Sequence, residues 1–188
     1  MAIPATMNAL VLEKFGTLPT LQRVPVPRPG ATEILVKIEV APINPADLSF
    51  MKGYYSSVKK VPVTVGSEGA GVVVEAGSDP YARSLIGKKV AILVEKGQHG
   101  CFAEYAVAEA MQAIEFPDSY CFEMGASGIV NPLSVVLMYK KIEERKDKAV
   151  ISNPGASALG RMLYRLLTHH GIPVINIVRR KEQADMLK

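Results

Sequence analysis

The sequence predicts a mixed α/β fold, in which a β-barrel or β-sandwich domain precedes the first part of a doubly wound parallel sheet. Short strands rich in Val and Ile follow one another through the first half of the chain. Beyond Pro117 apolar residues recur at helical spacing, and from Ala149 a strand, a turn, a helix and a second strand succeed each other. This order is typical of a parallel βαβ unit. We therefore expect two domains, residues 1–118 and residues 119–188.

The candidate strands of the first domain are bounded by Gly, Pro or Asp, which favour turns. Pro25, Pro27 and Pro29 indicate an edge, because proline cannot donate to a central ladder. Several short strands at this spacing favour a barrel or a sandwich over a parallel sheet. The expected strands are residues 7–12, 21–26, 34–40, 71–76, 89–94 and 102–107.

The second domain begins with two expected helices, over residues 119–129 and 132–144. Asn131 is the expected N-cap of the second helix, and Pro132 stands at its first position. A strand, a helix, a strand and the start of another helix are then expected at residues 149–152, 155–170, 173–178 and 181–188.

The parallel sheet of this second domain is expected to be incomplete. A doubly wound dinucleotide domain has about six parallel strands, and only two candidates precede the end of the sequence. We therefore expect a C-terminally truncated domain, with an apolar strand edge that is a liability unless another chain covers it.

Composition excludes several classes of protein. The net charge of +4 is small and the Lys and Arg residues are dispersed, which argues against nucleic-acid binding. No apolar run approaches the roughly 20 residues that span a bilayer, so no membrane partner is expected. Cys101 and Cys121 are too few for a disulfide framework, and no secretory segment opens the chain. A cytoplasmic location is therefore expected, although a mitochondrial one stays open.

A small-residue turn between strand and helix is the clearest functional motif. Its pattern is Gly155-x-Ser157-x-x-Gly160, with serine in place of the middle glycine of a dinucleotide-binding fingerprint. Such a turn lets pyrophosphate approach the unpaired N–H groups and the positive dipole of a helix N-terminus. The alternative is a tight turn that binds nothing. The expected cofactor-binding residues here are Gly155, Ala156, Ser157, Ala158, Leu159 and Gly160.

Two arginines, Arg179 and Arg180, end the second strand of the unit. An acidic residue at this place would accept bonds from the ribose hydroxyls and select NAD. An arginine there pairs instead with a 2′-phosphate through charge-assisted bonds. The pair therefore favours NADPH, against the alternative of a solvated basic strand end. The sequence leaves open which arginine reaches the phosphate.

Four segments resemble the medium-chain dehydrogenase/reductase superfamily. They are Ala-Pro-Ile-Asn-Pro-Ala-Asp at 41–47, Gly-Tyr-Tyr at 53–55, Gly-Ser-Glu-Gly-Ala-Gly-Val-Val at 66–73 and Asn-Pro-Leu-Ser at 131–134. The nucleotide motif continues the match in the expected order, and the resemblance covers nearly the whole chain. The resemblance is closest to the zinc-independent branch, the quinone oxidoreductases and 2-enoyl thioester (enoyl-acyl-carrier-protein) reductases. It implies a GroES-like β-barrel domain followed by a Rossmann domain.

The resemblance also bears on metal binding. Zinc enzymes of this superfamily carry Cys near the position of Asn44 and His at that of Ser67. Neither Asn nor Ser is a usual zinc ligand, and two cysteines cannot form a four-cysteine structural site. We therefore expect no zinc and no other metal.

The resemblance implies several further site residues. Tyr55 matches the candidate proton donor or carbonyl-orienting group of the thioester reductases, although a surface tyrosine of ordinary behaviour is the alternative. Asn44 is expected to line the pocket near the nicotinamide, and Asn131 to lie near its ribose. Asp47 is expected to cap a short helix, and Glu68 to be a structural carboxylate.

The expected function is an NADPH-dependent, zinc-independent oxidoreductase that reduces α,β-unsaturated carbonyl compounds, either quinones or enoyl thioesters. Its partner would be a small-molecule substrate, and a complete domain would form a homo-oligomer, expected to be a dimer. The alternative is a truncated or fragment protein of the same family, non-catalytic because it lacks a competent cofactor site.

Overall fold

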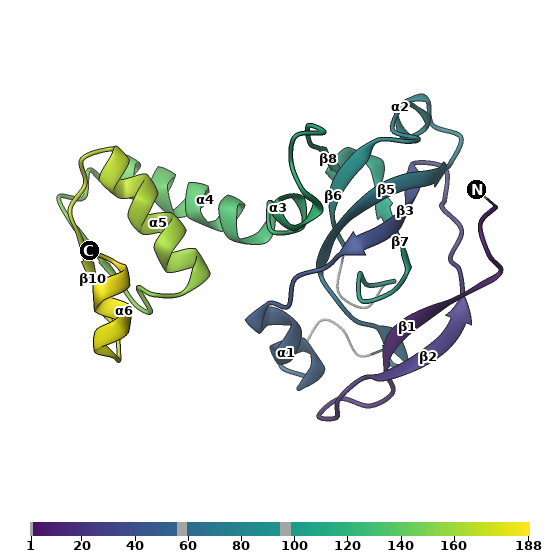
Figure 1. Ribbon diagram of the computed structural model, residues 1–188, viewed down its shortest axis with the longest axis horizontal. Coiled ribbons are helices and arrows are strands. Elements are labelled where there is room, and N and C mark those ends of the chain that lie inside the picture. The colour runs from purple at the N-terminus through teal and green to yellow at the C-terminus, as the bar shows by residue number, and fades with distance from the viewer. Residues whose placement is uncertain (1, 56–59, 95–98) are drawn as a thin grey trace. The chain divides into compact units, whose positions relative to one another are not determined.

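The computed structural model describes residues 2–55, 60–94 and 99–188. Two compact units make up the chain, Met1–Ile129 and Val130–Lys188. The first unit, purple to green in Figure 1, holds the antiparallel strands, and the second, green to yellow, holds a parallel pair of strands with helices. The mixed α/β class and the order of barrel before doubly wound unit are thereby confirmed. The domain boundary between residues 118 and 119 stays a prediction.

The first unit contains two antiparallel sheets. One has the order β2-β1-β4, formed by Thr20–Pro25, Thr6–Leu12 and Val63–Thr64. The other has the order β7-β3-β5-β6-β8. Its strands are β7 (Tyr105–Glu109), β3 (Glu33–Val40), β5 (Glu68–Ala76), β6 (Lys89–Leu93) and β8 (Ile114–Glu115).

The strand expected at 102–107 is displaced to β7, Tyr105–Glu109. The reason is a different partner for the residues before it. Cys101 and Phe102 donate backbone hydrogen bonds of 2.9 Å to the carbonyls of Gly66 and Val65. They therefore leave the ladder that β7 forms with β3.

Strand β3 is buried on both faces and organises the core. Ile34 and Val36 belong to one apolar cluster, whereas Leu35 between them belongs to another. This alternation follows from the two-residue period of a strand. All three side chains are fully buried, and each burial of this kind stabilises the fold by about 1.5–3 kcal/mol.

Short helices connect the strands of the first unit. They are α1 (Pro45–Met51), α2 (Pro80–Ser84), the 3-10 turn η1 (Ala110–Gln112) and α3 (Phe122–Ala126). The helix expected over 119–129 is thus limited to α3. Gly125 lies so close to the Phe116 ring that a Cβ would approach it to 2.5 Å, and glycines at 125 and 128 weaken the helix. Phe122 meets Phe116 edge to face, with ring centroids 6.0 Å apart.

The second unit runs in the order α4 (Val130–Arg145), β9 (Val150–Ser152), α5 (Ala158–His169), β10 (Val174–Asn176) and α6 (Lys181–Met186). Strands β9 and β10 are parallel, with Val150 opposite Val174 and Ser152 opposite Asn176. Helices α4 and α5 pack on each other through Val135, Ile142, Leu163 and Leu167.

Two helix starts differ from the expectations. Helix α4 begins at Val130, so Asn131 lies inside its first turn and the N-cap expected there is wrong. Pro132 is tolerated in that turn because its missing N–H would have no intrahelical partner. Helix α5 begins at Ala158 rather than Gly155, because the preceding residues form a turn that Ser157 caps.

One face of the parallel pair is exposed. Ile151 and Ile175, which alternate with core residues Val150 and Val174, are 67% and 59% exposed. Doubly wound domains carry helices on both faces of the sheet.

In the part of the chain that the structure describes, no helix combines the length and apolarity that crossing a bilayer requires.

Candidate cofactor-binding site

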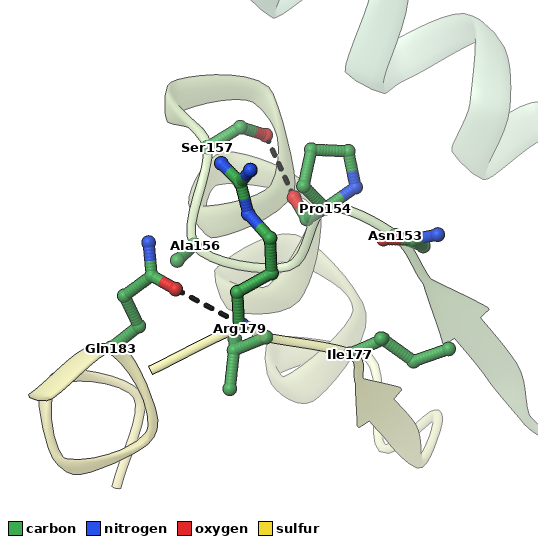
Figure 2. A pocket seen from close by; sticks show the side chains of 8 residues that line it. Asn153, Pro154, Ala156, Ser157, Ile177, Arg179 and Gln183 are labelled. Atoms are coloured by element: carbon green, nitrogen blue, oxygen red, sulfur yellow. Dashed lines mark hydrogen bonds between the residues drawn. The ribbon is translucent and has the colours of Figure 1, made fainter. Parts of the chain in front are cut away.

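A pocket of about 390 Å³ lies at the carboxyl ends of β9 and β10. The turn after β9 forms one wall, and the residues after β10 form the other, as Figure 2 shows. Ligands of open α/β sheets bind at this edge of the strands. The pocket is lined by Asn153, Pro154, Ala156, Ser157, Ile177, Val178, Arg179 and Gln183.

Two glycines make the turn tight. Gly155 donates a 3.0 Å backbone hydrogen bond to the carbonyl of Ile177, and a Cβ on it would lie 2.7 Å from the side chain of Asn176. A Cβ on Gly160 would approach the carbonyl oxygen of Pro154 to 2.5 Å. The glycines thus hold the turn against β10 and against the start of α5, as phosphate-binding turns require.

Ser157 explains how a serine fits at the middle position of the fingerprint. Its Oγ accepts a 2.9 Å hydrogen bond from the N–H of Gly160 and donates a 2.9 Å bond to the carbonyl of Pro154. The side chain is therefore folded back onto its own turn as the N-cap of α5. The remaining first-turn N–H groups and the helix dipole are what the turn offers an anion.

The two arginines occupy different places. Arg179 lines the pocket, and Figure 2 shows its side chain extending across the opening toward Ser157. Its backbone N–H donates a 3.1 Å hydrogen bond to Oε1 of Gln183. Arg180 is the N-cap of α6 and is not among the described residues that line the pocket. The geometry therefore brings Arg179, and not Arg180, to the pocket beside the Gly155–Gly160 turn.

Asn176, on β10 beneath the turn, has a buried side-chain oxygen without a hydrogen-bond donor among the described residues. A buried acceptor of this kind costs free energy until a donor reaches it. The tight glycine turn and the cationic Arg179 fit a site for an anionic ligand, whereas the Asn176 oxygen is an acceptor outside the described pocket lining and does not contribute to it.

The other expected cofactor residues have varied positions. Ala156 lines the pocket, whereas Leu159 packs against the α4–α5 core. Ala158 opens α5. Asn131 lies in the first turn of α4, and its role near a ribose stays a prediction. Reasoning from sequence missed five lining residues, Asn153, Pro154, Ile177, Val178 and Gln183. The sequence could have indicated most of them, because they follow the two predicted parallel strands, and ligands bind at the carboxyl ends of such strands.

Gly160→Ala is expected to weaken NADPH binding at least tenfold, because the added methyl would displace the backbone of the turn that carries Pro154. Titration of NADPH fluorescence measures the change. Gly171→Ala is the matched control, since Gly171 has φ of 71° but nothing within 4 Å of its Cβ position. That variant should lose about 1 kcal/mol of stability and keep its affinity. Unchanged affinity in Gly160→Ala would show that the turn does not hold the ligand.

The first unit contains a separate, buried polar network. Asp47 Oδ2 accepts a 2.8 Å hydrogen bond from the N–H of Asn44, and Asp47 Oδ1 accepts from the N–H of Ser67 at 3.1 Å and from its hydroxyl. Asn44 Nδ2 donates a 2.8 Å bond to Glu68 Oε1. All four side chains are buried. The network ties the start of α1 to the start of β5, so Asp47 and Glu68 both have the structural hydrogen-bonding roles expected of them.

Cys101 lies near this network and is fully buried. Burial raises the pKa of its thiol, and the carboxylates of Glu68 and Asp47 raise it further. The thiol is therefore neutral and a packing group, against Gly69. Across residues 2–55, 60–94 and 99–188, no three His, Cys, Asp or Glu side chains are grouped to hold a metal ion. The expectation that the site lacks zinc rests on the chemistry of Asn44 and Ser67.

Tyr55 and Tyr54 differ in their surroundings. Tyr55 is half-buried and packs beside Phe50, with ring centroids 6.4 Å apart. Tyr54 is 77% exposed. The catalytic roles of Tyr55 and Asn44 stay predictions.

Comparison with known proteins agrees with this architecture. Residues 30–118 match the alcohol dehydrogenase GroES-like domain. The chain is 32% identical to a mitochondrial enoyl-[acyl-carrier-protein] reductase of Caenorhabditis elegans over 186 residues, which cover 96% of this chain and 53% of that protein. The chain thus spans about half the length of the curated relatives it matches.

Solved structures show the same fold. The crystal structure of a proposed NADPH:quinone reductase from Mesorhizobium loti has a TM-score of 0.91 and 37% identity, covering 100% of this chain and 58% of that one. A mycobacterial protein in complex with NADPH has a TM-score of 0.84 and 27% identity, covering 96% and 55%. With its GroES-like domain, its nucleotide-type turn and these relatives, the chain has the fold of the medium-chain dehydrogenase/reductase family.

Proposed function

We propose that this chain serves an NADPH-dependent, zinc-independent oxidoreductase that reduces α,β-unsaturated carbonyl compounds. The observation that carries the cofactor choice is Arg179, which lines the pocket opposite the glycine turn at the end of β10. A guanidinium there suits a 2′-phosphate and lacks the acceptor that ribose hydroxyls need. The relatives named quinone reductase and enoyl reductase support the substrate class.

In such an enzyme, different residues of the chain would bind the cofactor and act on the substrate. The Gly155–Gly160 turn and the N-terminus of α5 would hold the pyrophosphate, and Arg179 would pair with the 2′-phosphate. When bound, NADPH supplies a hydride for the β carbon of the substrate. Tyr55 would hydrogen-bond the substrate carbonyl or supply the proton to the α carbon. Asn44, whose amide Glu68 fixes, would line the nicotinamide pocket.

The substrate, assembly and compartment belong to the same proposal. Quinones and enoyl thioesters both remain candidate small-molecule substrates, and turnover with a simple quinone against a crotonyl thioester would separate them. A homodimer is the proposed assembly when the doubly wound domain is complete. The cytoplasm is the proposed compartment, with the mitochondrion as the second candidate because the relative from Caenorhabditis elegans is named mitochondrial.

Arg179→Ala is expected to weaken NADPH binding by about 10- to 100-fold and to leave NADH binding nearly unchanged, because only NADPH carries the 2′-phosphate. Fluorescence titration with NADPH and with NADH measures the two affinities. Arg180→Ala is the matched control, since Arg180 lies outside the pocket lining that the structure describes. Equal affinities of the unaltered chain for both nucleotides would overturn the 2′-phosphate assignment. Absence of binding would favour the non-catalytic alternative.

A further inference from the structure

Gln183 completes the wall of the pocket from the side of α6. It follows Arg179 by four residues, and its Oε1 accepts a 3.1 Å hydrogen bond from the backbone N–H of Arg179. A backbone N–H can be accepted only by the oxygen of a carboxamide, so the positions of the two amide atoms are fixed. The NH₂ group must therefore lie on the other branch of the amide.

The free branch of this amide points into the pocket. Figure 2 shows the Gln183 nitrogen on the side of Ala156 and of the Arg179 guanidinium. The Arg179 guanidinium, which follows β10, and the Gln183 NH₂ group, on α6, thus both lie near the Gly155–Gly160 turn. Among the eight described residues that line the pocket, none carries a carboxylate. This donor set matches a phosphate monoester, which accepts hydrogen bonds, and does not match a pair of ribose hydroxyls seeking an acceptor.

We infer that Gln183 is a second specificity-determining residue, which donates through Nε2 to the phosphate on the adenosine ribose while Oε1 holds the backbone of Arg179. The inference rests on the proposed use of NADPH. It assigns two functions to one side chain. The oxygen holds the backbone at the base of the Arg179 side chain. The nitrogen adds a donor that binds an anionic phosphate more strongly than it binds a neutral hydroxyl.

Gln183→Glu separates these functions, because glutamate keeps the oxygen for the Arg179 N–H and replaces the NH₂ group by a second oxygen. The probes are adenosine 2′,5′-bisphosphate and adenosine 5′-phosphate, which differ only in the 2′-phosphate. We expect calorimetric titration to show affinity for the bisphosphate falling by about 10- to 100-fold, because the variant loses a hydrogen bond to a charged group and adds a carboxylate that repels the phosphate. Affinity for the 5′-phosphate should stay within about twofold.

Two further variants control the interpretation. Lys188→Gln changes the net charge by the same amount at the exposed end of the chain, and should leave both affinities unchanged. Gln183→Leu removes both polar atoms and should also lower affinity for the bisphosphate selectively. Thermal unfolding of each variant shows whether the fold is retained.

Failure of the Gln183 role and failure of the proposed 2′-phosphate site give different binding results. Preference for the bisphosphate in the unaltered chain that persists in Gln183→Leu would overturn the role of Gln183, even if Gln183→Glu lost it by charge repulsion, and would leave Arg179 as the determinant. An unaltered chain that binds both probes equally, or binds neither, would overturn the proposed 2′-phosphate site and the inference with it.

Discussion

Asp47→Ala is expected to destabilise the barrel unit by about 3 kcal/mol or more. The substitution leaves the N–H groups of Asn44 and Ser67 and the Ser67 hydroxyl without their acceptor, at buried positions. Each buried donor without a partner costs about 1–3 kcal/mol. Urea unfolding followed by far-ultraviolet circular dichroism measures the loss.

Asp79→Ala is the matched control for this variant. Asp79 Oδ1 also accepts two backbone N–H groups, those of Tyr81 at 2.9 Å and Ala82 at 3.0 Å, as the N-cap of α2. Water can replace this half-buried carboxylate, so the expected cost is about 1 kcal/mol. Similar losses in the two variants would contradict the view that burial makes the Asp47 network strong.

Tyr55→Phe is expected to lower kcat by about 100-fold for a protein that carries this chain, assayed as NADPH oxidation with an enoyl thioester. The variant removes the hydroxyl that would orient the carbonyl or deliver the proton. It keeps the ring that packs beside Phe50. NADPH affinity should therefore be unchanged.

Tyr54→Phe makes the same chemical change on the exposed neighbour, 77% accessible to solvent. Its kcat should match that of the unaltered protein. A Tyr55→Phe enzyme that turns over as fast as Tyr54→Phe would remove Tyr55 from the mechanism, whatever the cofactor preference.

Strong local signals predicted most elements of the fold. Strands β1, β3, β5 and β6 stand close to the ranges that their Val- and Ile-rich segments indicated. The two-residue strands β4 and β8 were missed, because two residues cannot display a period. The Asn131 cap failed for a different reason. Asn followed by Pro suits a helix start, but the helix begins two residues earlier, at Val130, which is compatible with proline in the first turn.

By itself the sequence determined the fold class and the family likeness, and it predicted the chemistry of the site from the glycine turn, the arginine pair, and the Asn and Ser that stand where zinc enzymes have ligands. These are properties of residue type and spacing, which a chain carries before it folds. The tertiary structure alone decided which arginine faces the turn, that Ser157 turns inward as a cap, and that Gln183 joins the pocket. It also brought Asp47 to Ser67, 20 positions away, and Asn44 to Glu68, 24 away. Such choices depend on where side chains point and what they pack against, which local propensity does not specify.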